Sequence, residues 1–254
     1  MSAVRSVIIG SNHGTGPLGR PLRYAESDAR AFHSGLRTQR VHDLTDCDLF
    51  VAPRRAEDVR QAVKSKAAGA RPGDLLLVYF AGHGVVEEEP GHGDGLFLAC
   101  AGASASDPLS GSLRLADVVK MCESSSAASA VVVLDCCFSG HPQGRSVLGP
   151  EYLRKLQTGR PLRRRSLPPP RGSGRIILAA CGENQYAHES SVLGHGLLTW
   201  ALLRTLRAAG PTEAVSVARL YASLQETLLR KTKGEQCPSL YGGDHGSSLP
   251  TFFS

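Results

Sequence analysis

Apolar residues along the chain follow two kinds of pattern. Short and nearly continuous apolar runs, typical of strands buried on both faces of a sheet, occur at residues 6–10, 74–80, 130–135 and 175–180. Apolar residues at helical spacing predict helices over residues 24–36, 56–68, 113–122, 195–208 and 215–230. Because strands alternate with helices, we expect an α/β fold with a mostly parallel sheet and helices on both faces.

The remaining segments predict loops and one long interruption. Residues 11–20 are rich in Gly and Pro, and residues 85–95 form a polar, Gly-rich stretch that we interpret as a loop. Residues 146–174 hold a basic cluster and three consecutive prolines, which continue neither helix nor sheet. We therefore expect three regions: residues 1–145, an exposed linker at 146–174, and residues 175–254, which complete the same fold with a last segment near 238–241.

The length of 254 residues, 41% of them hydrophobic, suits one sizeable domain or two subdomains that share a sheet. No apolar run approaches the roughly 18 residues that span a bilayer. The apolar stretch at the N-terminus is too short for a signal peptide. We therefore expect a soluble, cytoplasmic protein without membrane contacts.

The seven cysteines are odd in number, scattered and without a CxxC pair, which argues against a disulfide framework and a structural zinc site. Most of them are expected to be small buried hydrophobes. The formal charge is +6, but residues 154–175 carry eight basic and no acidic side chains, so the rest carries 6 − 8 = −2. This distribution argues against a nucleic-acid-binding face, although a linker that contacts nucleic acid weakly remains an alternative.

Two of the predicted strands end in turns that carry reactive side chains. YFAGHG contains His83 and VLDCCFSG contains Cys137, and in parallel sheets active sites gather at the carboxyl ends of strands. If the two strands are neighbours, His83 and Cys137 face each other there. A thiol needs such a partner to become a thiolate at neutral pH. Glycines flanking His83 allow a tight turn and a close substrate approach, and the N–H groups of Gly84 and Cys137 are candidates for an oxyanion hole.

These turns resemble those of the caspase/metacaspase family. YFAGHG is similar to the Y-S-G-H-G motif of metacaspases and DCCFSG to their D-x-C-H-S-G motif, an alignment that makes Cys137, not Cys136, the nucleophile. The spacing of 54 residues between His83 and Cys137 also agrees with caspases, in which the His lies about 50 residues upstream. RYAESDAR, CGENQYAHE, GHGLLTWALL and EQCPSL resemble further metacaspase segments. The resemblance implies a caspase–hemoglobinase fold with about six strands, a p20-like catalytic region before the linker and a p10-like region after it.

The resemblance also implies a substrate preference. In metacaspases two aspartates line the pocket for the residue before the cut, and the matching residues here are Asp28 and Asp135. Paired carboxylates hold Arg or Lys by charge-assisted hydrogen bonds, whereas caspases place arginine in this pocket to bind aspartate. Phe138 replaces the usual metacaspase His and Ala81 a Ser, and both replacements alter the detail of the pocket.

No cofactor is required for this chemistry, and we expect no metal site. The acidic cluster that makes several metacaspases calcium-dependent is not recognisable, and the run of glutamates at residues 87–89 is interpreted as a solvated face, so calcium dependence stays open. The loop GSNHGTG lacks the Lys-Ser/Thr of a phosphate-binding loop, which argues against nucleotide binding.

The resemblance thus implies a cysteine endopeptidase that cleaves protein or peptide substrates after Arg or Lys and is regulated by separate proteins. Cleavage of its own Arg-rich linker between residues 154 and 175 is one hypothesis, and an uncut flexible loop is its alternative. A catalytically silent, caspase-like scaffold or adaptor is the alternative for the whole chain.

Overall fold

The computed structural model describes residues 3–13, 20–38, 43–89, 93–104, 109–137, 146–147, 174–182, 185–210, 213–242 and 251–253. At residues 43–45, 86–89, 93–94, 146–147 and 251–253 it describes the backbone alone.

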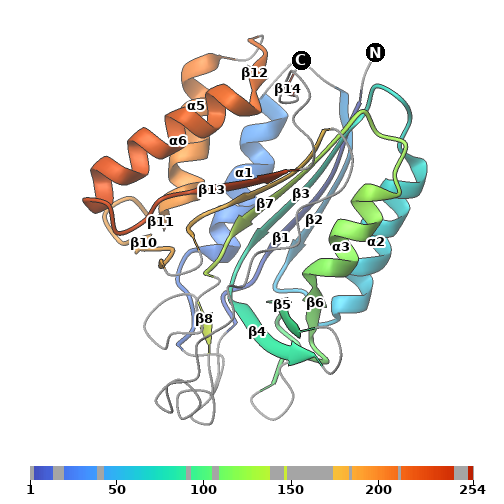
Figure 1. Cartoon of the computed structure of the whole chain (residues 1–254), viewed down its shortest axis with the longest axis horizontal. Helices are drawn as coiled ribbons and strands as arrows, with labels where there is room; N and C mark the ends of the chain where they lie inside the picture. The colour runs from blue at the N-terminus through green and yellow to red at the C-terminus, as the bar shows by residue number, and fades with distance from the viewer. Residues whose placement is uncertain are drawn as a thin grey trace.

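A six-stranded sheet forms the centre of the molecule (Figure 1). Its neighbouring strands are all parallel except the last pair, β13–β9, which is antiparallel. The order across the sheet is β13 (Ser239–Gly242), β9 (Arg175–Ala179), β7 (Ser129–Asp135), β3 (Leu75–Ala81), β1 (Ala3–Gly10) and β2 (Asp43–Val51). The predicted six-stranded, mostly parallel sheet is therefore confirmed.

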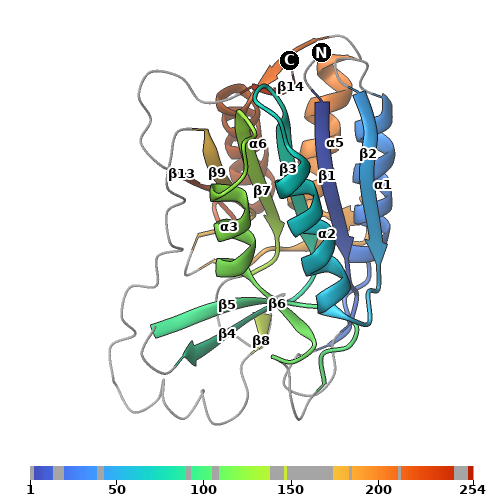
Figure 2. The same ribbon diagram turned by 90° about the vertical axis from the view of Figure 1, so that its right-hand side faces the viewer.

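Helices cover both faces of this sheet. Helices α1 (Ala25–Thr38), α5 (Leu197–Ala209) and α6 (Val217–Thr232) lie on one face, and α2 (Ala56–Gly69) and α3 (Leu115–Glu123) lie on the other (Figures 1 and 2). Every residue of the central strand β3 is buried, as expected for a parallel strand covered on both sides. The near-continuous apolar runs of the sequence follow from this double coverage.

A second sheet lies at the carboxyl edge of the first, directly after β3 (Figure 2). Its strands, in spatial order, are β6 (Ser112–Arg114), β5 (Gly93–Ala99), β4 (Gly84–Glu89) and β8 (Ser146–Val147). The predicted loop at residues 85–95 is therefore wrong, because most of it forms the antiparallel hairpin β4–β5. The hairpin is stabilised by a small core of its own, in which Val85, Phe97 and Ala99 pack against Ala103.

Short strands also shift the starts of two predicted helices. His195–Gly196 is strand β11, paired with β10 (Glu189–Ser190), so α5 begins two residues later than the periodicity indicated. Val215–Ser216 is strand β12, paired with β14 (Thr251–Phe253), so α6 likewise begins at Val217. The apolar spacing alone did not separate these strand residues from the helices that follow them.

The C-terminal part of the chain belongs to the same structural unit as the N-terminal part. Strand β9 pairs with β7 over five residues, and β13 pairs with β9 on its other side. Residues 148–173, which make up most of the predicted linker, lie outside the described residues. The division into three regions stays a prediction.

Candidate active site

The register of strands β3 and β7 brings His83 and Cys137 to the same edge of the sheet. Ala81, at the end of β3, pairs with Asp135, at the end of β7, so each candidate residue lies two positions beyond the same pair. The N–H of Gly82 donates to the carbonyl of Asp135 at 3.3 Å and keeps the two turns together. The condition set by the sequence, that the two strands be neighbours, is met.

Gly84 marks the closest approach of the two turns. A Cβ atom at this position would lie 2.5 Å from the carbonyl oxygen of Cys137 and 3.1 Å from a methyl carbon of Leu96. A side chain therefore has no room between the turn after His83 and the turn at Cys137. Glycine is required at position 84 because a side chain would clash with the Cys137 carbonyl. The role of its N–H in an oxyanion hole stays a prediction.

The imidazole of His83 is buried, with 1% of its surface exposed, and is held by a backbone group from a distant loop. Its Nε2 lies 3.0 Å from the carbonyl oxygen of Arg20. A carbonyl oxygen only accepts hydrogen bonds, so Nε2 carries the proton, and Nδ1 is the basic nitrogen of the neutral ring. Sequence reasoning missed Arg20, because a backbone carbonyl leaves no signature in residue type.

The sulfur of Cys137 lies under the chain segment that follows strand β9. Ala187 donates its N–H to this sulfur at 3.0 Å, and the carbonyl oxygen of Ala187 lies 3.7 Å from it. Burial raises the pKa of the neighbouring Tyr186 phenol, and negative charge on Cys137 raises it further. Cys137 itself has no exposed surface. Ala187 thus lies directly beside the sulfur, on the side where its N–H and its carbonyl contact it.

The remaining thiols differ in their surroundings. None of the seven cysteines forms a disulfide. Burial raises the pKa of Cys100 and of Cys122 to about 12, so neither forms a thiolate at neutral pH. Cys181 donates to the carbonyl of Gln185 at 3.3 Å. Five of the seven cysteines are buried, in agreement with their expected role as small core residues.

Asp28 and Asp135 both lie at the N-terminus of helix α5. Asp28 accepts from the N–H of Gly196 at 2.9 Å, and its other oxygen lies 2.6 Å from Nδ1 of His195. Asp135 accepts from the N–H of Thr199 at 3.2 Å and from its hydroxyl at 2.6 Å. Both carboxylates are fully buried. They therefore accept from N–H groups that the helix itself leaves without partners, at the end where its dipole favours negative charge.

The Asp135–Thr199 contact extends into the core. The hydroxyl of Tyr79 lies 2.5 Å from that of Thr199, and the Tyr79 ring stacks on Phe32 with the ring centroids 4.4 Å apart. Helix α5 is thus attached to strands β3 and β7 by buried polar contacts at the carboxyl edge. Sequence reasoning missed Thr199, because a threonine in an apolar helical pattern carries no signal of a buried partner.

Other predicted features are only partly covered by the structure. Phe138 lies outside the described residues, and the side chains at residues 87–89 are likewise not described. Within the described ranges, no cluster of three or more His, Cys, Asp or Glu side chains suits a metal ion. None of the helices in those ranges is long and apolar enough to cross a membrane.

Comparisons with known proteins agree with this geometry. The sequence model of the caspase domain, peptidase family C14, matches residues 4–245. A search of curated protein sequences found no match. A crystal structure of a Geobacter sulfurreducens protein superposes with a TM-score of 0.66 at 15% identity, covering 95% of this chain and 94% of that one. Caspase-1 from Spodoptera frugiperda superposes with a TM-score of 0.64 at 12% identity, covering 95% of this chain and 88% of that one.

At 15% and 12% identity, these structural similarities indicate a shared fold and nothing more. That fold is the caspase fold expected from the sequence. The family match covers nearly the whole chain, including both candidate turns and the strands after the linker. This chain belongs to the caspase domain family.

Proposed function

We propose that this protein is a cysteine endopeptidase that cleaves peptide bonds after Arg or Lys, with Cys137 as the nucleophile and His83 as its acid–base partner. The observation that carries the proposal is the strand register, which places both residues two positions beyond the Ala81–Asp135 pair. Membership of the caspase domain family supports the same chemistry.

The mechanism is acyl transfer. The Cys137 thiolate attacks the carbonyl carbon of the scissile bond, and the backbone N–H groups of Gly84 and Cys137 stabilise the resulting oxyanion. His83 donates a proton to the leaving amine and then activates the water that hydrolyses the thioester. The Arg20 carbonyl keeps the imidazole oriented by accepting from Nε2, the role that the third member of a catalytic triad performs.

The preference for Arg or Lys is supported by charge. Asp28 and Asp135 are acidic, and neither matched position holds the arginine with which caspases bind aspartate. Both carboxylates also anchor helix α5, so the proposal gives them two tasks: holding the helix and providing negative charge at the carboxyl edge of the sheet. A substrate guanidinium or ammonium group would gain a charge-assisted interaction there.

Hydrolysis of fluorogenic peptides ending in Arg, Lys, Asp or Asn tests the proposal, with and without calcium. We expect cleavage after Arg and Lys that is lost in Cys137→Ala and in His83→Ala but kept in Cys136→Ala, the matched control on the adjacent thiol. Cleavage after Asp would keep the peptidase and refute the roles of Asp28 and Asp135 in specificity. Equal activity of Cys137→Ala and wild type would refute the nucleophile.

Self-processing is a second part of the proposal. The stretch 154–175 is rich in Arg, the residue type after which the enzyme is proposed to cut. Incubating wild type and Cys137→Ala side by side should yield fragments ending between residues 154 and 175 in the wild type alone. An intact wild-type chain under conditions where it cleaves peptides would refute self-processing.

A silent scaffold is the second candidate function, and one observation favours it. Cys137 has no exposed surface and His83 has 1%, so the pair is closed in this structure. A thiol-directed activity probe distinguishes the candidates: labelling of Cys137 that requires His83 supports the peptidase. A folded protein whose Cys137 resists the probe in every condition, calcium included, would favour the scaffold.

A further inference from the structure

The feature that carries a further inference is a buried glutamine, Gln236, in the turn between helix α6 and strand β13. Its side chain has no exposed surface. The amide oxygen accepts from the N–H of His188 at 3.0 Å, and the amide nitrogen donates to the carbonyl of Ala180 at 3.0 Å. Since an N–H only donates and a carbonyl only accepts, the orientation of the amide is fixed by its partners.

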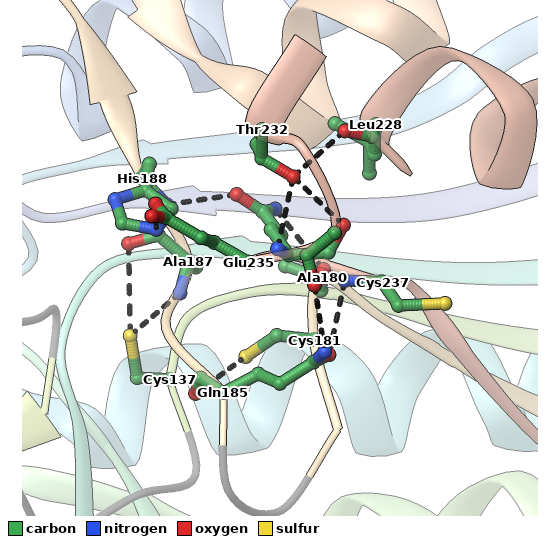
Figure 3. A network of polar contacts seen from close by, with 12 residues as sticks. Cys137, Ala180, Cys181, Gln185, Ala187, His188, Leu228, Thr232, Glu235 and Cys237 are labelled. Atoms are coloured by element: carbon green, nitrogen blue, oxygen red, sulfur yellow. Dashed lines mark hydrogen bonds and ion pairs between the residues drawn. The ribbon is translucent and has the colours of Figure 1, made fainter. Parts of the chain in front are cut away.

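These two bonds connect the sheet to the segment beside the nucleophile. Ala180 directly follows strand β9, and its own N–H donates to Leu134 of strand β7 at 2.8 Å. His188 directly follows Ala187, whose N–H donates to the Cys137 sulfur at 3.0 Å (Figure 3). Gln236 therefore ties the Ala187–His188 peptide to the rigid end of the sheet from which Cys137 itself extends.

The turn that carries Gln236 is itself anchored. The Thr232 hydroxyl lies 2.8 Å from the carbonyl of Leu228 (Figure 3). It also accepts from the backbone N–H of Gln236 at 2.9 Å. The next residue, Cys237, donates its N–H to the side chain of Gln185 at 3.0 Å. The backbone of Gln236 is thus held by the end of α6, and its side chain is held by Ala180 and His188.

We propose that Gln236 is a positioning residue of the active site: its amide oxygen holds the N–H of His188 and so fixes the preceding residue, Ala187, whose own N–H donates to the Cys137 sulfur and stabilises the thiolate. A hydrogen bond to the charged form of a group favours that form. The primary amide of Gln236 offers both the acceptor that the His188 N–H requires and the donor that the Ala180 carbonyl requires. The proposal rests on the proposed function in naming Cys137 as nucleophile, but the stabilisation of its thiolate is measurable without any turnover.

The test is a pH titration of the Cys137 thiolate by its ultraviolet absorbance. Each protein is compared with its own Cys137→Ala counterpart, so that the other thiols and the tyrosines cancel in the difference. We expect the apparent pKa to rise by about one unit in Gln236→Met, which keeps the volume and removes both bonds. This is a tenfold loss of thiolate at any pH well below the midpoint. The readout requires neither substrate nor access to the buried sulfur.

The matched control is Thr232→Val, which removes hydrogen bonds from the same turn but leaves the amide of Gln236 in place. We expect it to lower the melting temperature and to move the Cys137 midpoint by less than Gln236→Met does, because both bonds of the Gln236 amide remain. If Gln236→Met fails to fold, Gln236→Asn, whose amide is one methylene too short to reach both partners, takes its place with the same expected direction.

Two outcomes would overturn the proposal: an unchanged or lower midpoint in the folded Gln236 variants, or an equal shift in Thr232→Val. Because the titration needs no substrate, a shifted midpoint in a protein that cleaves no peptide would uphold the positioning role while refuting the proposed function.

Discussion

The substitution Gly84→Ala probes how closely the two candidate turns, after His83 and at Cys137, must approach. The added Cβ would lie 2.5 Å from the Cys137 carbonyl oxygen, about 0.9 Å short of the 3.4 Å at which ordinary contact begins. A second neighbour, a methyl carbon of Leu96, lies at 3.1 Å, so the side chain cannot simply tilt away from the carbonyl. One of the two turns therefore has to move by most of an ångström.

A movement of this size has two expected costs. Overpacking of a well-packed region typically destabilises by about 1–3 kcal/mol. A misplacement of about 1 Å between reacting groups costs on the order of 10²-fold in rate. We therefore expect Gly84→Ala to fold with a reduced melting temperature and to lose about 100-fold in kcat/KM on Arg peptides, with most of the loss in kcat.

The assay combines thermal unfolding with steady-state hydrolysis of the same peptide. The matched control is Gly69→Ala in helix α2, where the nearest atom to the added Cβ, in the Arg5 side chain, lies at an ordinary 3.6 Å. This control should keep wild-type kinetics and be slightly more stable, because alanine is the better helix former by about 1 kcal/mol. Wild-type kcat/KM in Gly84→Ala would refute the argument that contact between the turns sets the geometry of the site.

Three further predictions concern stability and thiol chemistry. Burial alone would raise the pKa of Asp74, yet the N–H groups and the guanidinium that donate to it hold that pKa below its ordinary value. The wild type should therefore lose stability as the pH falls below about 4, and Asp74→Asn should lose less in thermal melts between neutral and acid pH. Thr199→Val should lower the free energy of unfolding by about 2 kcal/mol in denaturant titrations, because it removes the hydroxyl that donates to the buried Asp135 carboxylate and leaves the backbone N–H of residue 199 as the one donor of this pair; a loss below about 0.5 kcal/mol, on the order of a surface substitution, would contradict this role. Cys100 and Cys122, whose pKa burial raises to about 12, should stay unmodified by iodoacetamide at neutral pH in the folded protein and react only after unfolding, as peptide mass spectrometry would show.

Local pattern was sufficient for the central strands and for the existence of every described helix. Helices cover both faces of the sheet, so nearly every residue of its inner strands is buried. This is why these strands, β1, β3, β7 and β9, are short apolar runs in the sequence. The position of the two candidate turns was also predictable, because His83 and Cys137 closely follow such runs and a parallel sheet brings strand ends to one edge.

Strand β2 was not predicted, because its stability comes from other elements. Its sequence, DLTDCDLFV, mixes carboxylates with apolar residues and has neither a continuous apolar run nor a helical period. In the fold, Asp46 forms ion pairs with Arg5 of β1 and Lys66 of α2, and Asp48 lies 3.1 Å from the Lys66 ammonium group. An edge strand whose charges are neutralised by its neighbours cannot be recognised before those neighbours are placed.

The hairpin β4–β5 was misread for a related reason. Residues 85–95 hold three glycines and three glutamates, which are typical of a loop, and the apolar residues of the hairpin include Val85 at the start of this stretch and Phe97 beyond its end. These two pack in a small core that exists only once the hairpin folds onto the loop at Ala103. The local composition therefore favoured a loop, whereas packing against residues distant in the sequence stabilises two paired strands.

The sequence by itself determined the fold class, the family resemblance and the candidate pair His83 and Cys137, because each is carried by residue type and spacing in one short segment. The tertiary structure alone decided what surrounds that pair: the Arg20 carbonyl at the imidazole, the Ala187 N–H at the sulfur and the Gln236 amide behind it. Two of these groups belong to the backbone, which is the same in every residue, and all three come from segments far from the residues they serve. These groups act where segments distant in the sequence come into contact in the fold, and a local sequence pattern contains no information about such contacts.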